Sequence, residues 1–179
     1  MIFRETAIAG AFVIHPERNV DSRGAFARTW CAREFARHHL ATTHAQSSVS
    51  MNTRRGTLRG MHYSITPHAE TKVVRCVRGA IFDVLLDLRV DSPTYLQWCA
   101  ETLTADNGVA FYVPEMVAHG FQTLEDASDV LYQMSEFYDA DCARGVRWND
   151  PAFDIRWPEG PRILSDRDRT YPDFLEPLP

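Results

Sequence analysis

The sequence predicts an all-β protein, a sandwich or barrel of many short strands with few helices. Runs rich in β-branched and large apolar residues recur at close spacing along the 179 residues, and turn signals separate them. The clearest turn signal is Asp106-Asn-Gly108, which is typical of a hairpin. Residues 31–40 are the best candidate for a helix, short and amphipathic. The length suits one domain with a sizeable core, so residues 1–179 are expected to form a single domain.

The first half of the chain is expected to begin with edge strands. Residues 1–20 alternate loosely between apolar and polar side chains, as one or two strands ended by His15-Pro16 would. Asp21-Ser-Arg-Gly24 carries turn chemistry. Beyond the helix, the polar residues 46–52 alternate as a strand does when one face meets solvent or a cavity.

The second half is a succession of strands and turns. Residues 72–79 and 80–89 are two apolar runs that meet at a glycine, and they are expected to pair with each other. Further strands are expected at residues 94–103, 109–113, 119–124 and 130–138, with turns at 91–93, 106–108 and 126–129. The tail from residue 139 holds most of the prolines, and Trp148 and Trp157 are expected to anchor it.

Composition narrows the function and the compartment. A net charge of -5 argues against general nucleic-acid binding, yet the segment from residue 54 to 78 is rich in arginine, which suits an anionic small molecule. The four cysteines form no Cys-x-x-Cys pair, so a zinc ribbon is not expected. The N-terminus lacks the apolar segment of a signal peptide, and no run approaches a membrane span. The simplest expectation is a reducing cytoplasm with no membrane partner.

The segment from Gly56 to Gly79 is the strongest candidate for a binding site. Gly56 and Gly60 are turn or bulge positions, and His62 follows at the start of an expected strand. A histidine can titrate near neutral pH, while Arg59 and Lys72 can hold an anion or stabilise an oxyanion. The alternative is a satisfied strand histidine flanked by surface cations.

The spacing of this segment resembles the two-part signature of the cupins, a family of small jelly-roll β-barrels. The matching positions are Gly56, His62, Lys72 and Gly79 in the first part, and Gly108, Pro114, Met116 and His119 in the second. In a metal cupin, Ser64 would be a second histidine and Lys72 a glutamate. An ammonium group cannot ligate a metal, and two histidines alone rarely make a tight site, so no metal and no cofactor are expected.

A closer resemblance, from about residue 21 to 168, is to dTDP-4-dehydrorhamnose 3,5-epimerases. The motifs that carry it are Gly56-Thr-Leu-Arg-Gly-Met-His-Tyr63, Lys72-Val-Val-Arg-Cys76, Phe82-Asp-Val-Leu-Leu-Asp-Leu-Arg89, Ser92-Pro-Thr94, Val113-Pro-Glu-Met-Val-Ala-His-Gly-Phe121, Trp148-Asn-Asp-Pro151, Trp157-Pro158 and Leu164-Ser-Asp-Arg-Asp168. The resemblance implies a homodimer of jelly-roll barrels in which N-terminal residues reach the neighbouring site.

The resemblance also implies roles. His62 matches the general base, Asp168 the carboxylate that orients it, Tyr132 the general acid, and Lys72 the residue beside the C4 oxygen of the sugar. The positions that hold the sugar or the nucleotide diphosphate are matched by Arg23, Phe26, Gln46, Ser48, Arg59, Lys72, His119, Tyr138 and Arg167. The family often has asparagine where this chain has Ser48. Without the resemblance, Tyr132 would be taken for a strand residue that packs its ring, and Asp168 for a solvated loop carboxylate.

The chemistry fits these residue types independently. The C–H bonds that flank a C4 ketone are weak acids, so removing such a proton needs a base within reach and a positive partner for the oxyanion. Inversion then needs a proton from the opposite face, which a tyrosine can supply. The resemblance thus implies the leading interpretation, an isomerase that epimerises a nucleotide-linked 4-keto-6-deoxy sugar at C3, C5 or both, as in deoxysugar biosynthesis.

Other interpretations stay open at this point. Arg28 and Ala143, like Ser48, depart from the family pattern near the ligand, and they leave open the sugar, the nucleotide and the number of inverted centres. The chain can thus be a single-centre epimerase acting on another nucleotide sugar, or a cupin that binds sugar nucleotides without catalysis. A metal-dependent cupin oxygenase is the weakest alternative, because of the residues at positions 64 and 72.

Overall fold

The computed structural model describes residues 1–160 and 163–175, and almost all of its regular structure is strand. The elements in order are β1 (Ile2–Glu5), β2 (Phe12–His15), β3 (Arg18–Asp21), β4 (Gly24–Ala27), α1 (Ala32–Arg37), β5 (Gln46–Asn52), β6 (Leu58–Ser64), β7 (Lys72–Arg78), β8 (Ala80–Asp87), β9 (Trp98–Thr104), β10 (Ala110–Val113), β11 (Val117–Thr123), β12 (Ser128–Met134), β13 (Ala143–Gly145) and α2 (Asp166–Arg169).

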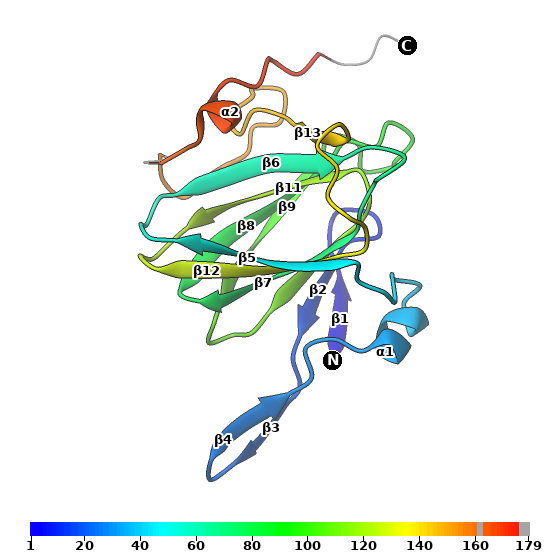
Figure 1. The fold of residues 1–179 in the computed structure, drawn as a ribbon, viewed down its shortest axis with the longest axis vertical. Coiled ribbons are helices and arrows are strands. Elements are labelled where there is room, and N and C mark those ends of the chain that lie inside the picture. The colour runs from blue at the N-terminus through cyan, green and yellow to red at the C-terminus, as the bar shows by residue number, and fades with distance from the viewer. Residues whose placement is uncertain (161–162, 176–179) are drawn as a thin grey trace.

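Two antiparallel sheets face each other and form the body of the molecule (Figure 1). One has the order β1-β2-β10-β7-β12-β5, and the other β13-β6-β11-β8-β9. Their inward side chains, such as Val74, Leu85, Phe111 and Phe121, are 0–1% exposed and make one core. Since successive side chains of a strand point to opposite faces, the core takes every second residue. The expected all-β jelly-roll barrel with a few short helices is confirmed.

The prediction that residues 72–79 pair with residues 80–89 is wrong. β7 lies between β10 and β12 in the first sheet, whereas β8 lies between β11 and β9 in the second. Gly79 between them has a φ of +71°, a conformation that is costly for other residues, and it sends the chain from one sheet to the other. The two runs are strands, but sequence alone did not show which partner each one takes.

The turn at residues 106–108 is likewise not a hairpin turn. It joins β9 of one sheet to β10 of the other, so the strands on either side of it do not pair. The expected strand at residues 94–103 begins only at Trp98, and the one at 130–138 is β12, which ends at Met134. The helix expected at residues 31–40 is the shorter α1.

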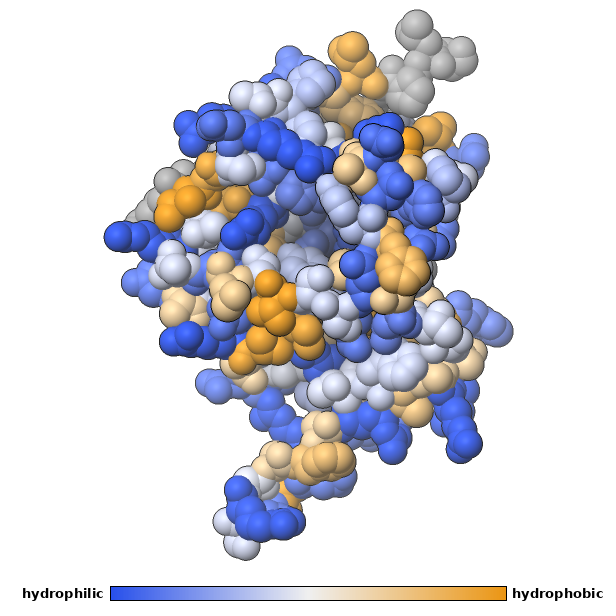
Figure 2. Space-filling view, viewed as in Figure 1, coloured by the Kyte–Doolittle hydropathy of each residue, from blue (hydrophilic) through white to orange (hydrophobic). Residues whose placement is uncertain are grey.

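A two-stranded hairpin of β3 and β4 stands apart from both sheets (Figure 1). The turn expected at residues 21–24 is at its tip, but its two strands were not foreseen. Figure 2 shows the hairpin clear of the body, with hydrophobic side chains towards its base and hydrophilic ones at its tip. Within the chain, almost nothing covers it: Phe26 is 75% and Val20 76% exposed.

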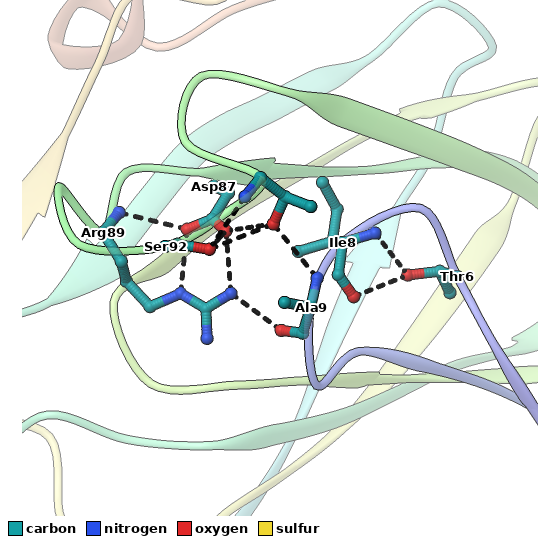
Figure 3. Close-up of polar contacts among 7 residues, drawn as sticks. Thr6, Ile8, Ala9, Asp87, Arg89 and Ser92 are labelled. Carbon is teal, nitrogen blue, oxygen red and sulfur yellow. Dashed lines mark hydrogen bonds and ion pairs between the residues drawn. The ribbon is translucent and has the colours of Figure 1, made fainter.

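A partly buried cluster of hydrogen bonds around Asp87 links the N-terminal segment to the end of β8 (Figure 3). The Asp87 carboxylate accepts hydrogen bonds from Arg89 Nε and Nη2, both at 2.8 Å, from Ser92 Oγ at 2.5 Å and from Thr94 Oγ1 at 2.6 Å. Arg89 Nη2 also donates to the Ala9 carbonyl at 2.7 Å. This hydrogen-bond cluster therefore links β8 to the turn between β1 and β2, which is distant in sequence.

Within residues 1–160 and 163–175, no helix is long and apolar enough to cross a membrane.

Candidate active site

A cavity of about 500 Å³ opens between the two sheets. Its volume is in the usual range for small-molecule sites. Strands of both sheets line it, as expected for a barrel whose alternate side chains point inward. The lining residues are Ser48, Val49, Ser50, Arg59, His62, Tyr63, Ser64, Glu70, Lys72, His119, Tyr132, Met134, Tyr138, Ala143, Arg144 and Arg167.

His62 and Asp168 form a closely bonded pair at one wall. His62 lies on β6, directly opposite His119 of β11, and its Nε2 is 2.6 Å from Asp168 Oδ1. Asp168 sits on the short helix α2, whose N-cap Ser165 accepts a hydrogen bond from the Asp168 backbone N–H at 3.1 Å. Because Nε2 is taken by the carboxylate, the other ring nitrogen, Nδ1, is the one left for proton transfer.

The Asp168 carboxylate is held in its charged form. Burial on its own would raise its pKa, but the hydrogen bond and the charge of His62 and the Gly60 backbone N–H outweigh burial and keep the pKa below its ordinary value. Asp168 is only 3% exposed, so it is not the solvated loop carboxylate of the alternative interpretation. A buried carboxylate in this position orients the imidazole and stabilises its protonated form.

Tyr132 faces the cavity from the opposite sheet. It lies on β12, between Ser48 of β5 and Val74 of β7. Burial raises the pKa of its phenol well above the ordinary value, the negative Asp83 adds to the rise, and Arg59 opposes it. The phenol thus keeps its proton at neutral pH and can act as an acid.

His119 fills the space beside Tyr132. The two rings meet edge to face with centroids 5.7 Å apart, and His119 Nε2 is 2.7 Å from Asp83 Oδ1. Asp83 is fully buried; burial raises its pKa, while the charge and hydrogen bond of His119 oppose the rise. The other carboxylate oxygen of Asp83 has no hydrogen-bond partner among the described residues. The buried histidine is therefore held in place by Asp83 beside Tyr132.

Lys72 enters the cavity from β7 with a carboxylate as its neighbour. Its Nζ is 3.2 Å from Glu70 Oε1, and Ser64 Oγ donates to the same oxygen at 3.4 Å. Sequence reasoning missed Glu70, although a signal existed. Glu70 lies two residues before Lys72, and residues two apart in an extended chain point to the same side.

The lining is positive overall. Arg59, Lys72, Arg144 and Arg167 contribute cations, against the single carboxylate of Glu70, in a chain whose net charge is -5. Arg59 is aimed by a hydrogen bond from its Nε to Asn52 Oδ1 at 2.8 Å. Arg144 was missed because β13 joins β6 only through a long-range pairing that no local pattern reveals. A concave positive surface of this kind attracts an anionic ligand such as a diphosphate.

Most of the site residues expected from the sequence come together here. Ser48, Arg59, His62, Lys72, His119, Tyr132, Tyr138 and Arg167 line the cavity, and Asp168 lies directly behind His62. Gln46 is at the rim, where its side-chain oxygen accepts a hydrogen bond from the Tyr138 backbone N–H.

Arg23 and Phe26 are the two exceptions. They lie on the β3–β4 hairpin, apart from the cavity of their own chain, and the Arg23 side chain is 89% exposed. Its guanidinium pairs only with the neighbouring Asp21, at 2.6 Å, among the residues that the structure describes. One chain therefore does not bring these two residues to its own site.

The cupin metal positions hold no set of metal ligands in this chain. Ser64 and Lys72 point into the cavity where a histidine and a glutamate would be needed. In the described part of the chain, no group of three or more His, Cys, Asp or Glu side chains is arranged to hold a metal ion.

Comparisons with known proteins agree on one family. A family model described as dTDP-4-dehydrorhamnose 3,5-epimerase matches residues 5–176. The dTDP-4-dehydrorhamnose 3,5-epimerase of Mycolicibacterium smegmatis is 43% identical to this chain, over 98% of the chain and 87% of the relative. The dTDP-4-dehydrorhamnose 3-epimerase of Streptomyces niveus is 39% identical, over 94% of the chain and 82% of the relative.

Solved structures give the same result. The crystal structure of dTDP-4-dehydrorhamnose 3,5-epimerase from Bacillus anthracis, with TDP and PPi bound, superposes on this chain with a TM-score of 0.93. It is 39% identical in sequence, and the superposition covers 97% of this chain and 99% of that one.

Proposed function

The chain belongs to the dTDP-4-dehydrorhamnose 3,5-epimerase family, and on this premise we propose how its cavity epimerises a nucleotide-linked 4-keto-6-deoxy sugar. The protein is an isomerase that acts on carbons next to the C4 ketone. One observation carries the assignment of roles. His62, backed by Asp168, and Tyr132 face the same cavity from opposite sheets, so a sugar between them can lose a proton on one face and gain one on the other.

In the first half-reaction, His62 Nδ1 takes the proton from a carbon next to the ketone, and the electron pair of the C–H bond moves into the enolate. The protonated imidazole is stabilised by the Asp168 carboxylate at 2.6 Å. The enolate oxygen develops negative charge, and Lys72, only 8% exposed, supplies an ammonium group to stabilise it. A metal is not needed for this step, because the ammonium group takes the electrophilic role.

In the second half-reaction, the Tyr132 hydroxyl gives its proton to the same carbon from the other face, which inverts the centre. The raised pKa of the phenol keeps that proton available until the carbanion forms. Arg59 and Arg167 at the cavity wall are suited to hold the diphosphate, and the TDP and PPi of the Bacillus anthracis structure support an anionic ligand of this kind.

We also propose that the active form is a homodimer. Arg23 and Phe26 match ligand-binding positions of the family, yet they lie on a hairpin that stands clear of their own cavity (Figures 1 and 2). A second copy related by a twofold axis can receive that hairpin and return its own.

The four cysteines are free, which supports a reducing compartment such as the cytoplasm.

A second candidate is inversion at C3 alone. The Streptomyces niveus relative, a 3-epimerase, is 39% identical to this chain, between the 35% of the Shigella flexneri 3,5-epimerase and the 43% of the Mycolicibacterium smegmatis 3,5-epimerase. A purely binding role is disfavoured, because a binder has no use for a carboxylate-backed imidazole opposite a phenol.

Two variants in one experiment separate the proposed base from the proposed acid. With the 4-keto sugar nucleotide in deuterium oxide, His62→Ala is expected to lose both exchange and inversion, by about 10²- to 10⁴-fold. Tyr132→Phe is expected to keep exchange, since His62 still acts on its own face, but to yield much less inverted product. Mass spectrometry measures the exchange, and NMR measures the inversion.

His68→Ala is the matched control, because His68 is also a histidine but does not line the cavity. Wild-type exchange in His62→Ala would show that the base is elsewhere. Wild-type inversion in Tyr132→Phe would reduce Tyr132 to a packing residue.

A further inference from the structure

Tyr171, two residues beyond α2, contacts both His62 and Arg167 without lining the cavity. Its ring meets the His62 imidazole edge to face, with centroids 6.3 Å apart and planes at 65°. Its hydroxyl accepts a hydrogen bond from Arg167 Nε at 2.7 Å. One side chain is thus in contact with the proposed base and with an arginine of the cavity wall.

The ring rests on Gly145, which is paired with His62 across β13 and β6. A Cβ atom on residue 145 would lie 2.3 Å from Tyr171 Cζ and 2.5 Å from its Cε2 and hydroxyl oxygen, closer than real Cβ contacts come. Gly145 is not among the glycines with a positive φ, so its backbone conformation does not require glycine. What glycine supplies at this position is room for the Tyr171 ring directly beside the strand residue that carries the base.

The phenol is held in its neutral form. Burial raises the pKa of Tyr171, and the neighbouring Arg167 opposes the rise without reversing it. The hydroxyl is therefore a stable acceptor for Arg167, whose guanidinium carbon also lies 5.8 Å from the centre of the same ring. Arg167 and Asp168 are neighbours on α2, so a shift of Tyr171 would move both the arginine of the cavity wall and the carboxylate that bonds His62.

We propose that Tyr171, seated on Gly145, is a positioning residue that holds the His62 imidazole and the Arg167 guanidinium in register with each other. This inference rests on the proposed function of His62 and Arg167. The ring limits how the imidazole can turn on the side away from the ligand, and the hydroxyl fixes the arginine that faces the diphosphate. Chemistry and binding are coupled through one side chain, since a misplacement of about 1 Å can cost about 10²-fold in rate.

Two variants separate the hydroxyl contact with Arg167 from the ring contact with His62. Tyr171→Phe keeps the ring and removes the hydroxyl, so it should raise KM by about tenfold while changing kcat much less. Tyr171→Leu removes the ring as well, so kcat should also fall and the pH profile of kcat/KM should change. In the ligand-free protein, the ring-proton NMR resonances of His62 should move in Tyr171→Leu, because the aromatic ring beside them is gone.

A double-mutant cycle tests whether the Tyr171 ring packs on Gly145. Gly145→Ala alone should lower kcat/KM by about tenfold or more, because the new methyl group displaces the ring. In the Tyr171→Ala background, the same substitution should cost almost nothing further. Gly160→Ala is the control, since a Cβ there meets no atom within 4 Å, and it should behave as wild type. Thermal unfolding of each variant shows that it is folded.

Different results would overturn this proposal and the proposed function. An equal cost of Gly145→Ala in both backgrounds, or equal effects of Tyr171→Phe and Tyr171→Leu on KM and kcat, would overturn the proposal and leave Tyr171 a packing residue. If the wild type shows no exchange at all, the proposed function fails instead. The positioning role is then decided by calorimetric affinity for dTDP, which Tyr171→Phe should weaken.

Discussion

In the proposed mechanism, the carboxylate of Asp168 determines how strong a base His62 can be. It is ionised throughout the neutral range, because its hydrogen bonds and the neighbouring imidazole keep its pKa below the ordinary value. A group whose pKa is lowered on folding contributes stability above its ordinary pKa and loses that contribution as the pH falls through the lowered value. The pair with His62 is therefore intact at neutral pH and weakens only in acid.

Asp168→Asn should reduce the rate on the order of 10²-fold or more, because the amide does not stabilise the protonated imidazole. Without the negative charge the imidazole releases its proton more readily, so the acid limb of the kcat/KM profile should move to lower pH. The plateau of the profile should also be lower. Stopped-flow exchange measured across pH checks both effects. Asp166→Asn, an exposed residue of the same helix, is the control. An unchanged profile and rate would remove Asp168 from the mechanism.

The predictability of single residues follows the range of their contacts. His62 and Lys72 could be proposed because each lies in a motif of the family, whereas Tyr132 could be proposed only through the family resemblance. Glu70 had a local signal that went unused. Tyr171 could not have been found, because its value comes from the room at Gly145, and β13 reaches β6 only in the folded chain.

Among the elements, the short N-terminal strands are linked to the end of β8 by the hydrogen bonds around Asp87. Burial alone would raise the pKa of Asp87, yet the hydrogen bonds from Arg89, Ser92 and Thr94 bring it from 3.8 to about 2. Arg89, which is held by Asp87, also donates a separate hydrogen bond to the carbonyl of Ala9 in the turn after β1. The short edge strands β1 and β2 thus depend on a polar anchor as well as on their own pairing.

Asp87→Asn should lower the free energy of unfolding by roughly 2–4 kcal/mol at neutral pH, because Arg89 is left without its buried partner. The folded pKa is lowered, so the stability that Asp87 contributes is lost as the pH falls from about 4 towards 2, and the difference between wild type and variant should shrink over that window. Urea unfolding at several pH values measures this. Asp91→Asn, in an exposed turn, is the control, and an equal loss there would contradict the account.

Strand positions could be predicted from the sequence far better than strand partners. Alternation and turn residues located β5, β7, β8, β10 and most of β11 and β12. They could not show that β7 and β8 belong to different sheets, because pairing is decided by the whole core. The β3–β4 hairpin was missed for a related reason: its exposed strands have no buried face to impose a pattern.

For the molecule as a whole, the hairpin is the part that a single chain leaves unused. If it completes the cavity of a second copy, Arg23 and His62 of one site come from different chains. Copies with Arg23→Ala and copies with His62→Ala, each poorly active alone, should then complement each other. A mixed dimer pairs one intact hairpin with one intact cavity, so random mixing should restore about a quarter of wild-type activity.

Co-expression of the two variants followed by an exchange assay measures this recovery. Arg4→Ala, on an exposed position of β1, replaces Arg23→Ala in the control mixture. No recovery beyond the sum of the separate variants would place Arg23 outside the partner's site.

The central claim is that the cavity removes and returns protons at the carbons flanking the ketone. The most direct test is position-resolved NMR of dTDP-4-keto-6-deoxyglucose incubated with the wild-type protein in deuterium oxide. The account predicts deuterium at C3 and C5 with inversion at both, and at C3 alone if this chain resembles the 3-epimerase of Streptomyces niveus. Recovery of the sugar with no deuterium at either carbon would contradict it.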